Sequence, residues 1–376
     1  MKYIKYAILL TAAVLAFSCV DNPSGLFYSL QYESEIIDGE LDNGLTIGDM
    51  AMRNAYYFIA SGAFRYKAVD GTTWSVSTPI DAAGYSCYKL INLDEIYAIF
   101  FHTDTLDYKL FKAVTTAVST DVITWSEIVI ADIPTDERLI DIAQSGGRLF
   151  LYTEKTVSVV SGNDKRYSVY STDATSLAAG TGLVDELDSL DSYGELDVDY
   201  DGANYWLISG NKLYSGLSGA LVEDTAAAEA SALILENGYG GVYCHGTDVY
   251  LSTDEGVLLK YTGGAWTDLT GAASLNRIFD IERVTIASES IDVLLLGSEK
   301  GYYELDLGAA APVFTSPETA DTKLSTPVQF ASIELSNDVI RSFFFDTDNN
   351  RIFALGYNAG LWENSLQANG RFWNVE

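Results

Sequence analysis

The feature of this sequence that most constrains its fold is a repeat of short β-type segments. A run of apolar and aromatic residues, preceded by a polar or Gly-containing turn, recurs seven times at a mean spacing of about 49 residues. These runs occupy residues 56–59, 96–100, 149–152, 205–208, 249–251, 293–296 and 352–355. A second turn and a further β-type segment follow each run, so each unit has the pattern of an antiparallel meander.

The repeat predicts a closed ring of sheets. A single four-stranded meander cannot bury both of its faces, whereas seven of them in a ring bury one another and leave few exposed edges. We therefore predict an all-β chain in which residues 26–376 form one domain, a seven-bladed β-propeller with four antiparallel strands in each blade. Eight blades are an alternative, because residues 25–29 resemble a stray third strand. A solenoid or a pair of β-sandwiches is the other alternative.

The first 19 residues have the pattern of a secretory signal peptide. Lys2 and Lys5 precede an apolar stretch at 6–17, which is too short to span a bilayer. The sequence therefore predicts an exported protein.

The end of this signal resembles a bacterial lipobox, in which a peptidase cleaves before a Cys that then carries lipid. The residues concerned are 15–19, and the resemblance makes Cys19 the lipidation site. Residues 20–25 would then be a flexible tether, and the protein would be held at the periplasmic face or the cell surface by its lipid alone. Ala16 and Ser18 also satisfy the rule for ordinary signal cleavage, which would release a soluble periplasmic or secreted protein.

Composition excludes two classes of protein. The chain has 53 Asp and Glu against 22 Lys and Arg, a formal charge of −31, so it would repel nucleic acid. Its 48% hydrophobic and 12% aromatic residues provide a core that a disordered chain lacks. The acidic surface suits solubility, and it would also attract divalent cations or a basic partner.

Residues for nucleophilic or metal chemistry are scarce, with three Cys and two His in the chain. Cys87 and Cys244 lie in apolar, strand-like runs and are expected to be buried thiols, with a disulfide as the alternative. Neither His102 nor His245 has a Cys or a second His at ligand spacing. We therefore predict no catalytic residues and no bound cofactor.

Four of the seven units share a Trp in the expected fourth strand: Trp74, Trp125, Trp266 and Trp373. In two of them an Asp, Asp70 or Asp121, stands four residues before the Trp. This pattern resembles the Asp-box or BNR-type repeat of sialidase-like propellers, in which the Asp closes a hairpin turn and the Trp packs between blades. The resemblance implies a structural role for these six residues. Sialidase activity would also need an Arg triad, and no Arg here has the Arg-Ile-Pro context typical of its first member.

One expected first strand is strongly acidic. Alternation places four of its carboxylates on one face, namely Glu195, Asp197, Asp199 and Asp201. From Asp197 the chain begins like a calcium loop, but Ile208 stands where that loop needs a bidentate Glu. Residues 346–350 repeat the pattern more weakly. We interpret both segments as acidic turns between first and second strands; the alternative is Ca²⁺ bound near the propeller axis by Asp197, Asp199 and Asp201.

Three long segments, 172–194, 215–231 and 308–329, are predicted to be loops, where binding functions concentrate. The function predicted is that of a non-catalytic, membrane-tethered envelope lipoprotein whose propeller binds a protein partner or serves as an assembly scaffold. The alternatives are a lectin-like glycan-binding propeller, a sialidase-like glycoside hydrolase and a cation-dependent propeller enzyme. A sugar array would separate glycan binding from protein binding.

Overall fold

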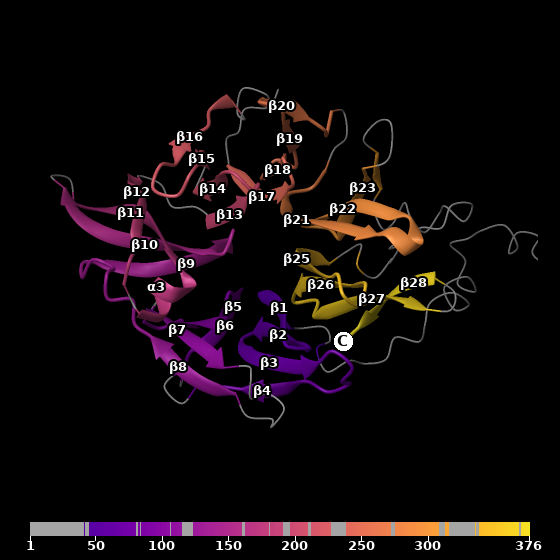
Figure 1. The fold of residues 1–376 in the computed structure, drawn as a ribbon, viewed down its shortest axis with the longest axis horizontal. Coiled ribbons are helices and arrows are strands. Elements are labelled where there is room, and N and C mark those ends of the chain that lie inside the picture. Colours follow the sequence, from indigo (N-terminus) through magenta and orange to yellow (C-terminus); the bar gives the residue numbers. More distant parts are fainter. Residues whose placement is uncertain are drawn as a thin grey trace, which may run out of the picture.

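The computed structural model describes residues 41, 45–79, 82, 84–105, 107–114, 123–159, 162–179, 181–190, 196–209, 212–226, 238–271, 275–307, 313–315, 335, 338–367 and 370–376. Within these residues, seven four-stranded antiparallel sheets surround a common axis (Figure 1), which confirms the seven-bladed β-propeller. The predicted signal peptide, Cys19 and the predicted tether lie outside the described residues.

The seven blades, A to G, follow the chain. Their strands are β1 (Asp49–Arg53), β2 (Tyr56–Ser61), β3 (Ala63–Ala68) and β4 (Ser75–Ser77) in blade A; β5 (Ser86–Asn92), β6 (Ile96–His102), β7 (Asp107–Val114) and β8 (Thr124–Ile128) in blade B; β9 (Glu137–Ser145), β10 (Arg148–Val159), β11 (Gly162–Asp173) and β12 (Val184–Leu190) in blade C; β13 (Leu196–Tyr200), β14 (Tyr205–Ser209), β15 (Lys212–Gly216) and β16 (Val222–Glu223) in blade D; β17 (Tyr239–His245), β18 (Asp248–Thr253), β19 (Leu258–Thr262) and β20 (Ala265–Asp268) in blade E; β21 (Ile278–Ile286), β22 (Ile291–Ser298), β23 (Tyr302–Asp306) and β24 (Phe314–Thr315) in blade F; and β25 (Val339–Asp346), β26 (Arg351–Tyr357), β27 (Leu361–Gln367) and β28 (Gly370–Val375) in blade G.

In each blade the strands pair in chain order, and the first strand lies nearest the axis (Figure 1). All seven apolar runs found in the sequence are second strands, as the repeat predicts. A second strand has hydrogen-bonded neighbours on both edges and packs against another blade on each face, so most of its side chains are buried. In β2, for example, Tyr57, Phe58, Ile59 and Ala60 have no exposed surface.

The hydrophobic core is divided among the blade interfaces. Each cluster of buried side chains joins the facing sides of two adjacent blades, and one such cluster is found in the described residues at each of the seven interfaces. Between blades A and B, for example, Phe64 of β3 and Phe100 of β6 pack around Trp125 of β8. A blade is therefore stable only with its neighbours, as the prediction of a ring assumes.

The three segments predicted to be loops are not loops throughout. Residues 172–194 contain a short helix, α3 (Ala174–Ala179), and the fourth strand β12, while 215–231 contains β16 and 308–329 contains β24. These outer strands lack a Trp, and β16 and β24 are only two residues long. Their patterns are therefore too weak to distinguish from those of polar loops, and only pairing with the third strand defines them.

Residues just before β1 attach the two ends of the ring to each other. The Leu41 N–H donates to the backbone oxygen of Glu376 at 2.6 Å, and the Leu361 N–H donates to the oxygen of Leu41 at 3.0 Å. The Ile47 N–H donates to the oxygen of Gly356 at 3.1 Å. Blades G and A are thus joined by backbone hydrogen bonds from this segment.

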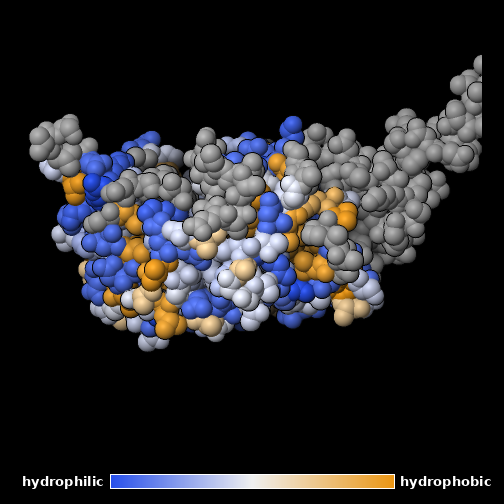
Figure 2. All heavy atoms as spheres, turned by 90° about the horizontal axis from the view of Figure 1, so that it is seen from above, coloured by the Kyte–Doolittle hydropathy of each residue, from blue (hydrophilic) through white to orange (hydrophobic). Residues whose placement is uncertain are grey.

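Seen edge-on, the described surface is largely hydrophilic with scattered hydrophobic areas (Figure 2), in keeping with the acidic composition. In the part of the chain that the structure describes, no helix combines the length and the apolar character needed to cross a bilayer.

Candidate functional site

The fourth-strand Trp residues lie at blade interfaces. The Trp125 indole N–H donates to Ser77 Oγ of blade A at 2.9 Å, and the Trp373 indole N–H donates to Tyr302 Oη of blade F at 3.1 Å. Each Trp therefore contacts the blade that precedes its own.

The other two Trp residues occupy equivalent places. Trp74 is buried in the cluster that joins blades G and A, and Trp266 packs edge-on against Trp206 of blade D, with ring centroids 5.7 Å apart. Asp70 lies exposed in the turn before Trp74, and Asp121 lies outside the described residues. The four Trp residues therefore pack between blades, each at a different interface, and are not gathered in one surface site.

Asp197 and Asp199 join two blades. Asp197 Oδ2 accepts the N–H of Val242 at 2.8 Å, and Asp199 Oδ2 accepts the N–H of Cys244 at 2.6 Å. Both donors belong to β17, the first strand of the next blade. Asp201 does not point with them: it closes the β13–β14 turn, accepting the Asn204 N–H at 2.7 Å. Asp346 accepts the Asn349 N–H at 3.1 Å in the equivalent turn of blade G, and Glu195 is not among the described residues.

The same bridge recurs at two other interfaces. Asp49 Oδ2 accepts the Leu90 N–H of blade B at 2.9 Å, and Asp280 Oδ2 accepts the Phe343 N–H of blade G at 2.7 Å. Neighbouring first strands belong to different sheets, and these carboxylates satisfy N–H groups that would otherwise lack a partner. Asp49 and Asp280 were not predicted from the sequence; the signal that could have indicated them is an acidic residue among the first three residues of a first strand.

Burial changes the protonation of these bridging carboxyls. It raises the pKa of Asp49 to about 6 and that of Asp197 to about 7, and it also raises the pKa of Asp199 and Asp280. Burial alone would lower the pKa of Lys89, but the charge of Asp141, whose Oδ1 lies 3.3 Å from Lys89 Nζ, contributes to a net increase. Among the described residues, no three His, Cys, Asp or Glu side chains are grouped so as to hold a metal ion.

The thiols do not form a bridge. Cys87 on β5 is buried and Cys244 on β17 is half-buried, and both are free, so the disulfide alternative is wrong. Burial raises the pKa of the Cys87 thiol well above its usual value, so the unreactive thiol form predominates.

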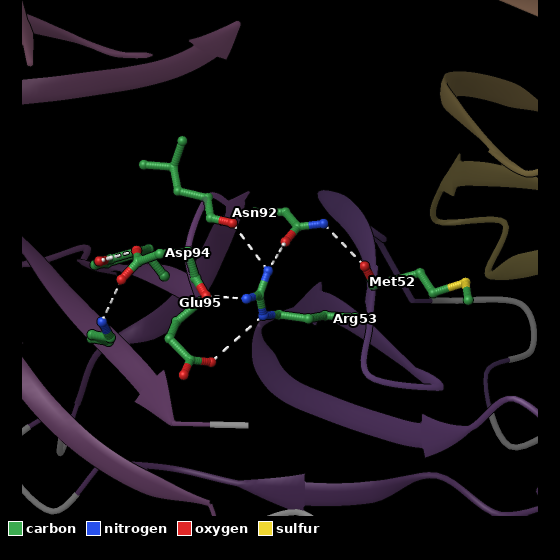
Figure 3. A network of polar contacts seen from close by, with 8 residues as sticks. Met52, Arg53, Asn92, Asp94 and Glu95 are labelled. Carbon is green, nitrogen blue, oxygen red and sulfur yellow. Dashed lines mark hydrogen bonds and ion pairs between the residues drawn. The ribbon is translucent and has the colours of Figure 1, made fainter. Parts of the chain in front are cut away.

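A polar network joins blades A, B and C at the turns between first and second strands. Arg53 donates to Asn92 Oδ1 at 3.2 Å and to the Leu93 oxygen at 3.0 Å, and Asn92 Nδ2 donates back to the Met52 oxygen at 3.0 Å (Figure 3). Gln144 of blade C continues the network, because its Oε1 accepts the Asn92 N–H at 2.8 Å. The groups of this network are engaged with one another, which suits a structural role.

A groove of about 310 Å³ lies between blades B and C. Its lining includes Phe101 and Tyr108 from blade B and Arg138, Glu154, Lys165 and Tyr167 from blade C. The Phe101 and Tyr108 rings pack with centroids 4.7 Å apart. The groove lies toward the β6–β7 and β10–β11 hairpins, the opposite end of the blades from the network of Figure 3.

A charged group is fixed on the blade C side of this groove. Glu154 Oε1 accepts from Arg138 Nη2 at 2.9 Å, and Glu154 Oε2 accepts from Lys165 Nζ at 2.7 Å. The Glu154 side chain is 9% exposed, whereas those of Arg138 and Lys165 are 43% and 56% exposed. One buried carboxylate therefore holds two exposed cations at the mouth of an aromatic groove, which could orient a polar ligand.

No protein-family model and no curated protein sequence matches this chain. Solved structures do share its fold. YCF48 from Cyanidioschyzon merolae has a TM-score of 0.55 at 13% identity, over 88% of this chain and 98% of that one. YCF48 bound to D1 peptide has a TM-score of 0.51 at 16% identity (88% and 95% covered), and BBS1N in complex with ARL6DN has 0.50 at 14% (89% and 98%). At these identities the likeness shows the fold alone.

Proposed function

We propose that this chain is an exported, lipid-anchored β-propeller that catalyses no reaction and binds an extended segment of a partner protein in the groove between blades B and C. The groove carries the proposal, since it combines aromatic surface with fixed charges on a rigid framework, and such features anchor protein partners. At about 310 Å³ it lies at the small end of ligand pockets and would admit one or two side chains of a partner.

Two further observations support a protein partner. The solved propellers similar in fold include YCF48 with a bound D1 peptide and BBS1N with ARL6DN, so rings of this shape do bind peptides and proteins. Tethering through Cys19 would suit a binding protein, because it would hold the ring at the surface where envelope partners are found.

The peptide-binding proposal is tested with a phage-displayed library of random peptides selected on the purified protein. Changing Tyr108→Ala should weaken the selected peptides about tenfold or more, because an aromatic anchor of the groove is lost. Tyr261→Ala is the matched control, since Tyr261 is also a half-buried Tyr in a third strand, on blade E, and should leave binding unchanged.

Equal binding by wild type and the Tyr108→Ala variant would place the peptide site elsewhere and contradict the proposal. A glycan array provides the second arm. Tyr108-dependent binding to sugars, with no peptide selected, would favour the lectin-like alternative.

The tether is tested by changing Cys19→Ser. The variant should move from the membrane fraction to the soluble fraction, because Ser lacks the thiol that carries the lipid. Unchanged fractionation of a normally exported variant would favour ordinary signal cleavage.

A further inference from the structure

Resting on the proposed peptide-binding function, we propose that the groove between blades B and C anchors an acidic side chain of the partner, an Asp or Glu that stands beside an aromatic or apolar residue. The chain as a whole carries a formal charge of −31 and favours basic partners at long range. At close range the groove has the opposite preference.

The charges that face the groove leave a positive surplus. Among the groove-lining residues that the structure describes, Arg138 and Lys165 are the cations and Glu154 is the carboxylate that both contact, which leaves one positive charge in excess. Asp164 also acts on Tyr167 from this side, and its carboxylate pairs with Arg166 at 3.0 Å. The surplus therefore persists when Asp164 and Arg166 are included.

Lys165 provides donors for a second carboxylate. An ammonium group has three N–H donors, and the contact with Glu154 Oε2 at 2.7 Å uses one of them. The Lys165 side chain is 56% exposed, so a ligand can reach it. A carboxylate placed here would form charge-assisted hydrogen bonds, which are stronger than those between neutral groups.

Glu154 is a positioning residue in this arrangement. Its side chain is 9% exposed and lies on β10, so it fixes Arg138 and Lys165 before a ligand arrives. Cations that are already ordered lose less conformational freedom on binding, which distinguishes them from isolated surface lysines. The Phe101 and Tyr108 rings lie across the groove and provide an apolar contact for the residue beside the acid.

The lining favours an internal acidic side chain over a chain-terminal carboxylate. Terminal carboxylates are commonly captured by nests of backbone N–H groups, whereas clusters of Arg and Lys side chains are the usual readers of acidic motifs. The cationic groups of this groove are the side chains of Arg138 and Lys165.

The test selects random phage-displayed peptides on wild-type protein and on a neutral variant, Arg138→Met, Glu154→Gln, Lys165→Met. This triple change removes the charges together, so no unpaired charge is left buried. Lys300→Met is the control, because it removes the same net charge from an exposed site on blade F. Lys165→Gln alone keeps the contact between Arg138 and Glu154, and it serves as a second variant should the triple variant melt early.

Peptides selected on wild type should carry Asp or Glu beside an aromatic or apolar residue. Their affinity should fall about tenfold or more in the triple variant and by a smaller factor with Lys165→Gln, and it should decrease with added salt. Replacing the acidic residue of the peptide by its amide should cause the same loss on wild type and no further loss on the triple variant.

Three results would overturn the inference. Selected peptides that depend on Tyr108 but carry no acidic residue, or that bind the triple variant as tightly as wild type, would refute the acidic anchor while leaving the peptide-binding function intact. Selected peptides that bind without regard to Tyr108 would refute both.

Discussion

At the scale of single residues, buried carboxylates join the first strands of adjacent blades. Asp280 of blade F accepts the Phe343 N–H at 2.7 Å and the Ser342 hydroxyl at 2.9 Å, both from blade G. Asp49, Asp197 and Asp199 make corresponding bridges at other interfaces. Each bridge satisfies backbone donors that belong to a different sheet, so we expect the ring to depend on these side chains for stability.

Replacing Asp280 by Ala should lower the free energy of unfolding by about 1–3 kcal/mol, because the Phe343 N–H and the Ser342 hydroxyl lose their acceptor. Urea denaturation measures the change. Asp70→Ala, in an exposed turn, is the control and should stay within about 0.5 kcal/mol of wild type. Equal effects of the two substitutions would show that the bridge contributes nothing.

The bridging carboxyls should also make stability depend on pH. Asp49 and Asp197 have folded-state pKa values of about 6 and about 7, against an ordinary value of 3.8. The folded protein therefore binds their protons more tightly than the unfolded chain does. This stabilisation is complete below about pH 4 and is lost as the pH rises through 6 and 7, at about 1.4 kcal/mol for each unit by which a group's pKa is raised.

The urea concentration at the unfolding midpoint should accordingly decrease as the pH is raised from 5 to 8, and Asp197→Asn should reduce the slope by removing one of the groups that titrate over this interval. A midpoint that rises over this interval, or an unchanged slope in the variant, would contradict the assignment.

At the scale of elements, the fourth strands hold adjacent blades together through Trp side chains. Trp373 of β28 is buried and donates to Tyr302 Oη at 3.1 Å. Trp266 of β20 is equally buried, but its indole nitrogen has no hydrogen-bond partner within the described part of the chain. The two strands therefore use the same residue with different polar contacts.

Trp373→Phe should cost about 1 kcal/mol more than Trp266→Phe, because only the first substitution removes a buried hydrogen bond. Thermal melting and urea denaturation measure the stability of the two variants. Both substitutions remove the same part of the indole ring, so the difference between them reports the hydrogen bond. A larger loss for Trp266→Phe would reverse this ranking of the two contacts.

At the scale of the whole molecule, a charged cluster closes the ring between blades G and A. Lys67 is 4% exposed and forms an ion pair with Glu376, which also accepts from the Trp74 indole N–H at 3.4 Å. Burial and the neighbouring Glu376 carboxyl raise the pKa of Glu363 to about 7. Burial alone would raise the pKa of Glu376 too, but contacts with Glu363 and Lys67 lower it overall. Lys67 thus neutralises an acidic pair where the ring closes.

Lys67→Met should destabilise the ring by about 3 kcal/mol, because it leaves the half-buried Glu376 charge without its partner. The double variant Lys67→Met, Glu376→Gln should recover at least about 1 kcal/mol, since both charges are then absent. Lys155→Met, which breaks an exposed pair with Asp136, is the control and should change stability by less than about 1 kcal/mol. If the Lys67→Met variant is as stable as the double variant, or more stable, Lys67 does not have this role in closing the ring.

The sequence by itself determined the propeller and its seven blades. Second strands are buried on both faces, so each repeat contains a run of apolar residues that can be recognised in the sequence. The first such run includes Tyr57 in β2 and the last includes Phe353 in β26. The turn residues Asp201 and Asp346 were also predictable, since an Asp side chain caps the backbone a few residues away.

Only the tertiary structure decided which residues meet between blades. Asp280 reaches Phe343 from 63 positions away in the chain, and the groove brings Phe101 of one blade to Lys165 of the next. The weak fourth strands β16 and β24 were likewise defined by pairing alone. The periodicity of a strand encodes which side chains face inward, but the residue opposite each of them is set by the twist and stagger of one sheet against another, which no local pattern records.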